Sequence, residues 1–98
     1  MFIGSMSLDL LLGDVRSLKQ KRSVVRPIVA ELRRRFEVSV AETGHLDLHH
    51  RAELGVCLVA ADHGHCAEVL QACERLVAAR PEVEMLAARQ RIWDELDE

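Results

Sequence analysis

The stretch that decides the fold is residues 2–36, FIGSMSLDLLLGDVRSLKQKRSVVRPIVAELRRRF, in which the hydrophobic period changes from two residues to about 3.6. Residues 1–12 alternate between two faces, which predicts a strand with one buried side. Its inward set is Phe2, Gly4, Met6, Leu8, Leu10 and Leu12. Gly13 and Asp14 predict the turn that ends the strand.

Residues 17–36 have the period of an amphipathic helix, for which Ser17 is the expected N-cap. The apolar stripe contains Leu18, Val25, Ile28, Val29, Leu32 and Phe36. Pro27 removes a backbone donor and disfavours a straight helix by about 3 kcal/mol. We therefore expect either a kink at Pro27, or a short turn over residues 17–22 followed by a main helix that begins near Ser23.

The rest of the chain supplies three more strands and one more helix. Alternation predicts strands at residues 37–43, 52–61 and 82–93, with a polar connection at residues 44–51. A second helix should begin at Asp62 or Gly64 and end before Pro81. The order β-α-β-β-α-β predicts an α+β, ferredoxin-like fold, with both helices on one face of a four-stranded antiparallel sheet and the first and third strands at its centre.

Length and composition indicate one globular domain over residues 1–98, with an acidic tail at 94–98 that we expect to fray. Hydrophobic residues make up 49% of the chain, which is enough for a core. The apolar start lacks a basic flank and a long apolar run, so we expect neither a signal peptide nor a membrane span. Three cysteines without CxxC spacing argue against a disulfide framework or a zinc module. The expected location is cytoplasmic.

Charge is strongly segregated along the chain. Residues 16–35 contain eight cations and one anion, a net charge of +7, whereas the other residues contain five cations and fifteen anions, a net charge of −10. At about 100° per residue, four of the cations form a stripe roughly 60° wide beside the apolar face. These four are Lys19, Arg22, Arg26 and Arg33. Such a stripe attracts phosphate, an anionic membrane or an acidic protein.

The run Ser17-Leu18-Lys19-Gln20-Lys21-Arg22-Ser23-Val24-Val25 resembles the SLKEKR signature of small bacterial proteins called the YlxP or DUF503 family. Residues 38–42, 47–48 and 51–56 are similar to the second and third strands of that family. The chain departs from the family pattern at Gln20, where Glu is usual, and at His49 and His50, where an aromatic residue and Gln are common. The resemblance implies a ferredoxin-like fold. Because the genes of the family often lie among those for transcription, translation initiation and ribosome maturation, it also implies an association with RNA or the ribosome.

Phosphate binding is the chemistry that the basic segment favours, because guanidinium groups bind phosphate oxygens in pairs and ammonium groups add field. The candidate nucleic-acid or anion-binding residues are Arg16, Lys19, Lys21, Arg22, Arg26, Arg33 and Arg34. We therefore expect a non-enzymatic domain that binds RNA or a ribosomal particle through its first helix. We expect no cofactor, no metal, no membrane partner and no small-molecule substrate.

The alternative is a protein-interaction module whose basic helix docks an acidic partner and whose open sheet face forms a homodimer. That face is expected to expose Ile3, Leu11, Val59, Ala61, Leu86 and Ile92. An RNA-reading sheet is not expected, because the outward sets of the two central strands contain neither an aromatic nor a basic residue.

Histidines and cysteines give weaker signals. His45, His49 and His50 lie in one loop, and His63 and His65 lie at the start of the second helix. The two groups should adjoin opposite ends of the third strand, too far apart for one metal site. Cys66 and Cys73 fit a buried stripe, and Cys57 points to the other face of the sheet. No side chain is positioned to activate Cys57, so no catalytic residue is predicted.

Overall fold

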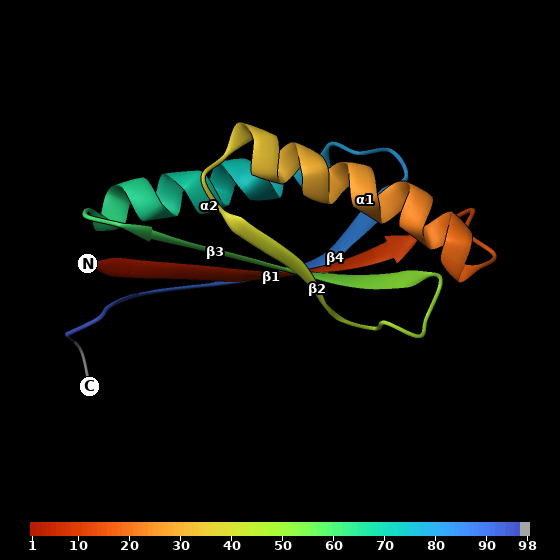
Figure 1. Ribbon diagram of the computed structural model, residues 1–98, viewed down its shortest axis with the longest axis horizontal. Helices are drawn as coiled ribbons and strands as arrows, with labels where there is room; N and C mark the ends of the chain where they lie inside the picture. Colours follow the sequence, from red (N-terminus) through yellow and green to blue (C-terminus); the bar gives the residue numbers. More distant parts are fainter. Residues whose placement is uncertain (97–98) are drawn as a thin grey trace.

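The computed structural model describes residues 1–96, and these form two layers (Figure 1). The elements follow the predicted order and are β1 (Phe2–Leu12), α1 (Leu18–Arg35), β2 (Ser39–Gly44), β3 (Arg51–Ala60), α2 (His63–Ala78) and β4 (Val83–Asp94). The four strands form one sheet in the order β2-β3-β1-β4, and every neighbouring pair is antiparallel. The predicted ferredoxin-like fold is confirmed, including the central positions of β1 and β3.

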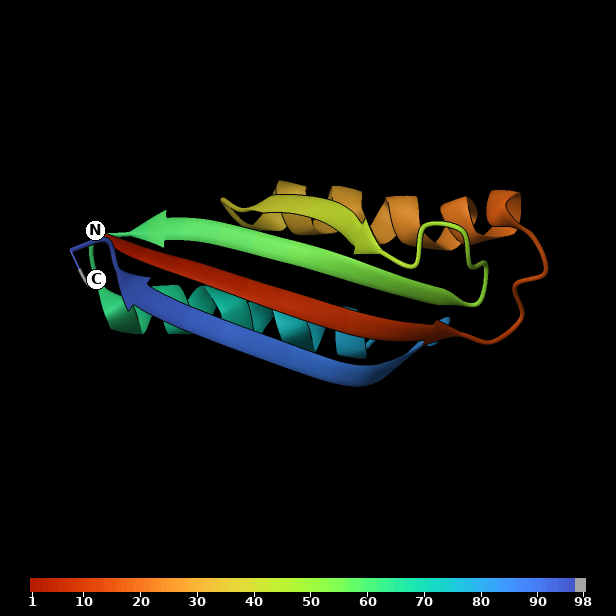
Figure 2. The same cartoon turned by 90° about the horizontal axis from the view of Figure 1, so that it is seen from below.

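Both helices cover the same face of the sheet and leave the other face open (Figures 1 and 2). Viewed from the sheet side, α1 lies toward β2 and α2 toward β4. Within residues 1–96, no helix is long and apolar enough to cross a membrane.

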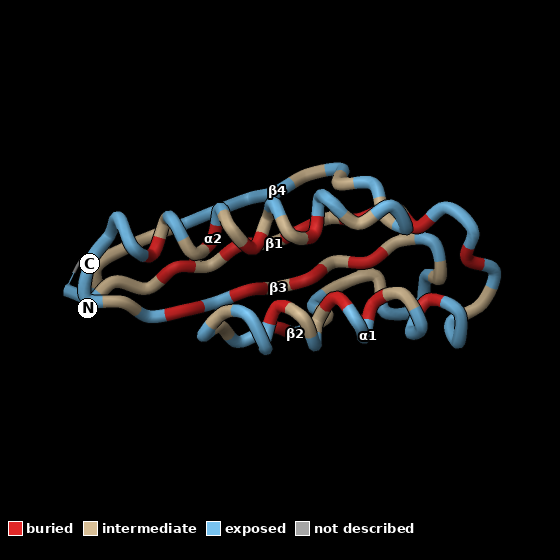
Figure 3. The backbone as a smooth tube through the Cα atoms, turned by 90° about the horizontal axis from the view of Figure 1, so that it is seen from above, coloured by how far each residue is buried: buried red, intermediate tan, exposed pale blue. Residues whose placement is uncertain are grey.

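The core lies between the two layers, where Figure 3 shows the buried residues alternating along β1 and β3. The inward side of β1 is buried from Gly4 to Leu12. It meets Ile28 and Leu32 of α1 and Leu70 and Val77 of α2, all of which are fully buried. Cys66 and Cys73 belong to this core, as predicted, and burial raises the pKa of the Cys73 thiol to about 11.

Helix α1 is one helix from Leu18 to Arg35, with Pro27 inside it. The predicted break that would start the main helix near Ser23 is therefore wrong. Pro27 lies on the exposed side of α1. The carbonyl four residues earlier, which loses its backbone donor at proline, therefore faces solvent rather than the core. The predicted caps are confirmed, because Ser17 accepts from the Gln20 amide at 3.1 Å and Asp62 from the His65 amide at 2.8 Å.

A β-bulge between β1 and β4 changes which residues of β4 face outward. Asp9 is opposite Ala87, but the next residue, Leu10, is opposite Met85, so Leu86 is the extra residue. Ile92 is opposite Gly4 and packs against the core. Its predicted place on the open face is therefore wrong, and Trp93, opposite Ile3, lies there instead.

The two ends of the described chain are held together. The Glu95 amide donates to the Met1 carbonyl at 3.0 Å, and the Met1 ammonium lies 3.7 Å from Glu95 Oε1. Of the tail predicted to fray, residues 94–96 thus make defined contacts, and residues 97–98 lie outside the described residues.

Helix α2 approaches β1 most closely at Gly4, which has no side chain to hold it off. A Cβ atom at Gly4 would lie 2.4 Å from Cys66 Sγ, 3.1 Å from Leu70 Cδ1 and 3.2 Å from Leu58 Cδ2. The first distance is far inside van der Waals contact, so any larger residue must displace the Cys66 side chain or push α2 away from the sheet.

We expect Gly4→Ala to lower the free energy of unfolding by about 1–3 kcal/mol, because it overpacks this contact. Urea denaturation measures the loss. Gly13→Ala is the matched control, since nothing lies within 4 Å of its added Cβ. In the Cys66→Ala background the same change should cost less. Equal losses at positions 4 and 13 would contradict the close approach.

Candidate nucleic-acid interface

The start of α1 is fixed by its own capping residues. Besides the Ser17 cap, Gln20 Oε1 accepts from the Arg16 amide at 2.6 Å, so two backbone donors at the helix start are satisfied by side chains. Gln20, the departure from the family signature, thus performs a local structural role. These contacts hold Arg16 directly beside the first turn of the helix.

Helix α1 turns most of its cations to solvent because its other face is used for packing. Val25, Ile28 and Leu32 are buried, and this orients the opposite side outward. Six of the seven candidate residues are exposed: Arg16, Lys19, Arg22, Arg26, Arg33 and Arg34. The structure therefore brings the predicted stripe to the surface of α1, with Arg16 just before the helix and Arg34 turned about 100° from Arg33. Together these exposed cations form the basic row.

Most of these cations have no anionic partner within residues 1–96. Among these residues no carboxylate lies within ion-pair distance of Arg16, Lys19, Arg22, Arg26 or Arg34. The one acid of the segment, Glu31, pairs instead with Arg35 at 3.4 Å and with Arg80. The charge of the stripe is thus not neutralised by direct pairs in the described fold.

Arg33 is exposed, but its side chain also forms a hydrogen bond with β2. Its Nη2 donates to the Val40 carbonyl at 2.6 Å, on an edge strand of the sheet. This bond covers one acceptor of an otherwise open strand edge. The remaining guanidinium donors of Arg33 stay available beside the stripe.

Lys21 does not belong to the exposed set, and its predicted place there is wrong. It is 2% exposed. Its Nζ donates to the carbonyls of His45 at 2.8 Å and Leu48 at 2.7 Å, and lies 2.6 Å from Glu42 Oε1. The burial of Lys21 could have been predicted from the spacing, because residues 21, 25, 28 and 32 lie on one helix face and the last three are apolar.

The buried ammonium of Lys21 anchors the connection between β2 and β3 under α1. His45 has a φ of 56°, a left-handed conformation that is uncommon outside glycine, and its carbonyl also accepts from the Leu48 amide at 3.0 Å. The ammonium thus holds a tight turn in which the His45 carbonyl has one other donor, the Leu48 amide, and the half-buried Leu48 carbonyl depends on Lys21.

We expect Lys21→Ala to lower the free energy of unfolding by about 3 kcal/mol or more, because Glu42 loses its buried cation, the Leu48 carbonyl its donor and the His45 carbonyl one of its two donors. Lys19→Ala, two residues earlier and exposed, should change it by less than about 0.5 kcal/mol. Thermal or urea denaturation makes the comparison. Similar values for both variants would rule out the anchoring role.

A second charged cluster lies on the open face of the sheet, at the end near this turn. Arg51 Nη2 lies 2.7 Å from each oxygen of Asp9, and His45 Nε2 lies 3.6 Å from Asp9 Oδ1. The hydrogen bond from Arg51 lowers the pKa of Asp9 below its ordinary value, assisted by the charges of Arg51, His45 and Arg89 and opposed by desolvation. Asp9 is therefore a stable carboxylate rather than a proton donor for catalysis.

Stability should depend on pH through Asp9 in a definite direction. Because its pKa is lowered in the folded state, the ionised carboxylate stabilises the fold above the unfolded-state pKa, and this contribution disappears as pH falls through the folded-state value. Asp9→Asn should therefore be less stable than the parent at neutral pH, with a difference that shrinks in acid below the ordinary pKa of 3.8. Urea titrations across pH measure it, with exposed Asp47→Asn as control. A difference independent of pH would contradict the pairing.

Strand β4 places aromatic and basic side chains on the open face that the sequence interpretation missed. Arg89, Arg91 and Trp93 lie opposite Ser7, Ser5 and Ile3 respectively, and the Arg91 guanidinium sits 4.7 Å from the Trp93 ring centroid. The sequence pattern does show the change of phase at the bulge. Val83 and Met85, before the bulge, face inward at odd positions, whereas Ala88 and Ile92, after it, face inward at even positions.

The histidines remain in two separate groups. His49 and His50 contact each other edge to face at 5.3 Å, and His63 contacts Phe2 at 5.6 Å. Among residues 1–96, no three side chains of the His, Cys, Asp and Glu types come together in a way that could hold a metal ion.

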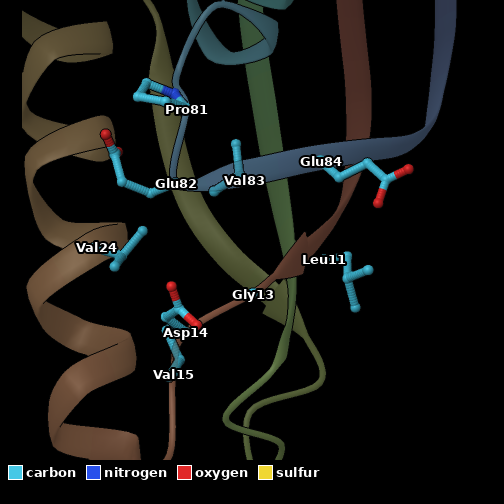
Figure 4. Close-up of a pocket in the computed structure, with 9 residues that line it drawn as sticks. All are labelled: Leu11, Gly13, Asp14, Val15, Val24, Pro81, Glu82, Val83 and Glu84. Atoms are coloured by element: carbon cyan, nitrogen blue, oxygen red, sulfur yellow. The ribbon is translucent and has the colours of Figure 1, made fainter.

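A surface hollow of about 350 Å³ lies beside the N-terminal half of α1 (Figure 4). Val24 of α1 lines one side, and the end of β1, the start of β4 and the segments that adjoin them line the rest. The acids at its rim are Asp14, Glu82 and Glu84. Because this lining contains no cation, the hollow is unsuited to phosphate and separates an acidic surface from the basic stripe.

Comparison with known proteins places the chain in a family. The family model described as "Protein of unknown function (DUF503)" matches residues 3–90. The chain belongs to this family. The resemblance drawn from residues 17–25 is thereby confirmed. The uncharacterised protein YlxP of Bacillus subtilis (strain 168) is 29% identical over 87 residues, covering 89% of this chain and 95% of the relative.

Solved structures share the fold at low sequence identity. A de novo designed protein with a ferredoxin fold aligns with a TM-score of 0.57 at 12% identity, covering 99% of this chain and 89% of its own. A point mutant of SnoaB, a cofactor-independent oxygenase from Streptomyces nogalater, aligns with a TM-score of 0.55 at 10% identity, covering 98% of this chain and 95% of its own. At these identities the likeness concerns architecture alone.

Proposed function

We propose that this chain binds RNA, or a ribonucleoprotein such as a ribosomal particle, through the exposed cations of α1. The observation that carries the proposal is the set of five cations without an ion-pair partner in the described residues, four on one capped and well-packed helix and Arg16 directly before it. Because the helix that carries them is already folded and packed, the backbone needs little reorganisation to meet a phosphate chain, which lowers the ordering cost of binding.

The chemistry of the row supports contact with a phosphate backbone. Four of its five cations are arginines, which stay charged at any physiological pH and bind phosphate oxygens in pairs. Arg22 and Arg26 are one turn apart, with their Cα atoms separated by about 6 Å along the helix axis. Contacts of this type position a protein on nucleic acid without reading its sequence.

The acidic charge of the rest of the chain favours binding at α1 alone. Outside residues 16–35 the net charge is −10, so the remaining surfaces repel an RNA approaching from another side. The role proposed is binding rather than catalysis, and it places the protein in the cytoplasm with RNA and ribosomes.

The test is binding of the purified protein to bacterial RNA and to ribosomal subunits across a salt titration. Affinity should fall steeply with salt, because each phosphate contact releases counterions. Arg22→Glu with Arg26→Glu should abolish binding at moderate salt. The milder pair Arg22→Gln with Arg26→Gln should reduce the slope of log affinity against log salt by about 1.4 if each arginine contacts one phosphate of a single strand.

A matched control separates a local site from general charge effects. Arg75→Glu changes one exposed arginine in the last turn of α2, and Arg22→Glu changes one exposed arginine of α1. RNA affinity should fall for Arg22→Glu and stay within about twofold for Arg75→Glu. Equal losses, or affinity unchanged in the Arg22 and Arg26 double reversal, would refute the proposal. Capture of a partner that survives nuclease treatment and requires Arg22 would point to an acidic protein instead.

A further inference from the structure

The open face of the sheet differs in character from the basic helix. Helices cover only the opposite side, so this face is unpartnered across the described chain (Figure 2). It exposes apolar side chains, with Val59 61% exposed. On β1, β3 and β4 it carries three acids, Asp9, Glu53 and Glu84, and three arginines, Arg51, Arg89 and Arg91. A face with balanced charge suits a protein surface better than a polyanion.

The strand register arranges this face in rungs that run from β4 through β1 to β3. Each rung has one residue from each of the three strands, in that order. The five rungs are Trp93–Ile3–Val59, Arg91–Ser5–Cys57, Arg89–Ser7–Gly55, Ala87–Asp9–Glu53 and Glu84–Leu11–Arg51. The β4 member and the β3 member of each rung are therefore equally distant from β1.

The β4 and β3 sides of this face are complementary about an axis that runs along β1, where each β1 side chain meets its own copy and the Asp9 carboxylate is already paired with Arg51 of its own chain. A two-fold rotation about such an axis places β4 of one copy over β3 of the other, rung on rung. In two of the rungs a large side chain of one copy then lies over a small one of the other, Arg91 over Cys57 and Glu53 over Ala87. Apolar faces apolar where Trp93 meets Val59.

The remaining two rungs match in charge and shape. Glu84 of one copy faces Arg51 of the other. Arg89 faces the position of Gly55, where the surface forms a hollow of about 370 Å³ with Ser5, Ser7 and Ala41 in its lining. A side chain at Gly55 would have to displace Thr43, because a Cβ atom would lie 2.7 Å from Thr43 Cγ2. The guanidinium entering this hollow would lie beside Glu53, which also lines it.

The size of the face fits such an interface. Four strands about 4.8 Å apart, with about ten residues of 3.3 Å each on average, give roughly 600 Å² per copy. Two copies would then bury about 1,200 Å², the lower end of the range for specific interfaces. Packed sheets whose strands cross at about 30° keep the central rungs in register.

We infer that the open face of the sheet binds a second copy of this chain in a two-fold dimer, with β4 of each copy over β3 of the other. The inference is independent of RNA binding. It leaves both α1 helices on the outside of the dimer, pointing away from each other.

Substitutions that introduce and then reverse a charge at the facing positions 57 and 91 test the inference. Sedimentation should show a dimer for the parent chain at micromolar to submillimolar concentration. Cys57→Arg sets a large cation under Arg91 of the second copy, so it should weaken self-association at least about tenfold. Adding Arg91→Glu to that variant should restore it. Lys19→Glu, on α1, should leave the dimer unchanged. A parent chain that is monomeric throughout, or a dimer indifferent to Cys57→Arg, would overturn the inference.

A cross-link tests the geometry directly. Arg91→Cys should be joined to the native Cys57 of the second copy by a bis-maleimide with a spacer of about 10 Å, the distance between facing sheets, and give a covalent dimer on a denaturing gel. Within one chain the same two positions are two strand spacings apart, and a link between them would leave the chain a monomer on the gel. Gln90→Cys, the adjacent residue on the helix side of β4, is the control. Equal cross-linking at positions 90 and 91 would exclude this arrangement.

Discussion

The fold depends on β1 being locked in one register by the burial of a single side. Its inward residues from Gly4 to Leu12 are covered by both helices, and its outward residues face the open side. A slip of one residue would exchange the two sets and expose Leu8, Leu10 and Leu12. Because β3 and β4 both pair with β1, every other strand position, and hence the support under α1, follows from this register.

Periodicity was sufficient to predict the layers, because each predicted element has a clear apolar side. It was insufficient where one residue changes the local phase. Leu86 bulges out of β4 and reverses the faces of the residues that follow, so Ile92 was assigned to the open face and Trp93 was not. Pro27 was expected to kink or interrupt the first helix. Because it lies on the exposed side, α1 continues past the missing hydrogen bond.

The basic stripe could be predicted from residue spacing, but the state of each cation could not. Which guanidinium finds a partner depends on residues distant in the chain, such as Val40 for Arg33 and Arg80 for Glu31. Lys21 is the clearest case, because its acceptors lie 21 to 27 residues away, in β2 and the turn that follows it. A charged residue on the apolar face of a helix thus indicates an internal partner more strongly than an external one.

The burial of Lys21 also gives the molecule an unusual chemical property. Lys19 and Lys21 are the only lysines of the chain, so the exposed basic row contains one amine among arginines. A reagent specific for amines should therefore modify the native protein at Lys19 and at the amino terminus alone. Lys21 becomes reactive only when its anchored turn opens, so its rate of labelling would report the local opening of that turn. The same selectivity would apply to an enzyme that acetylates lysine, for which only one side chain of the row is within reach.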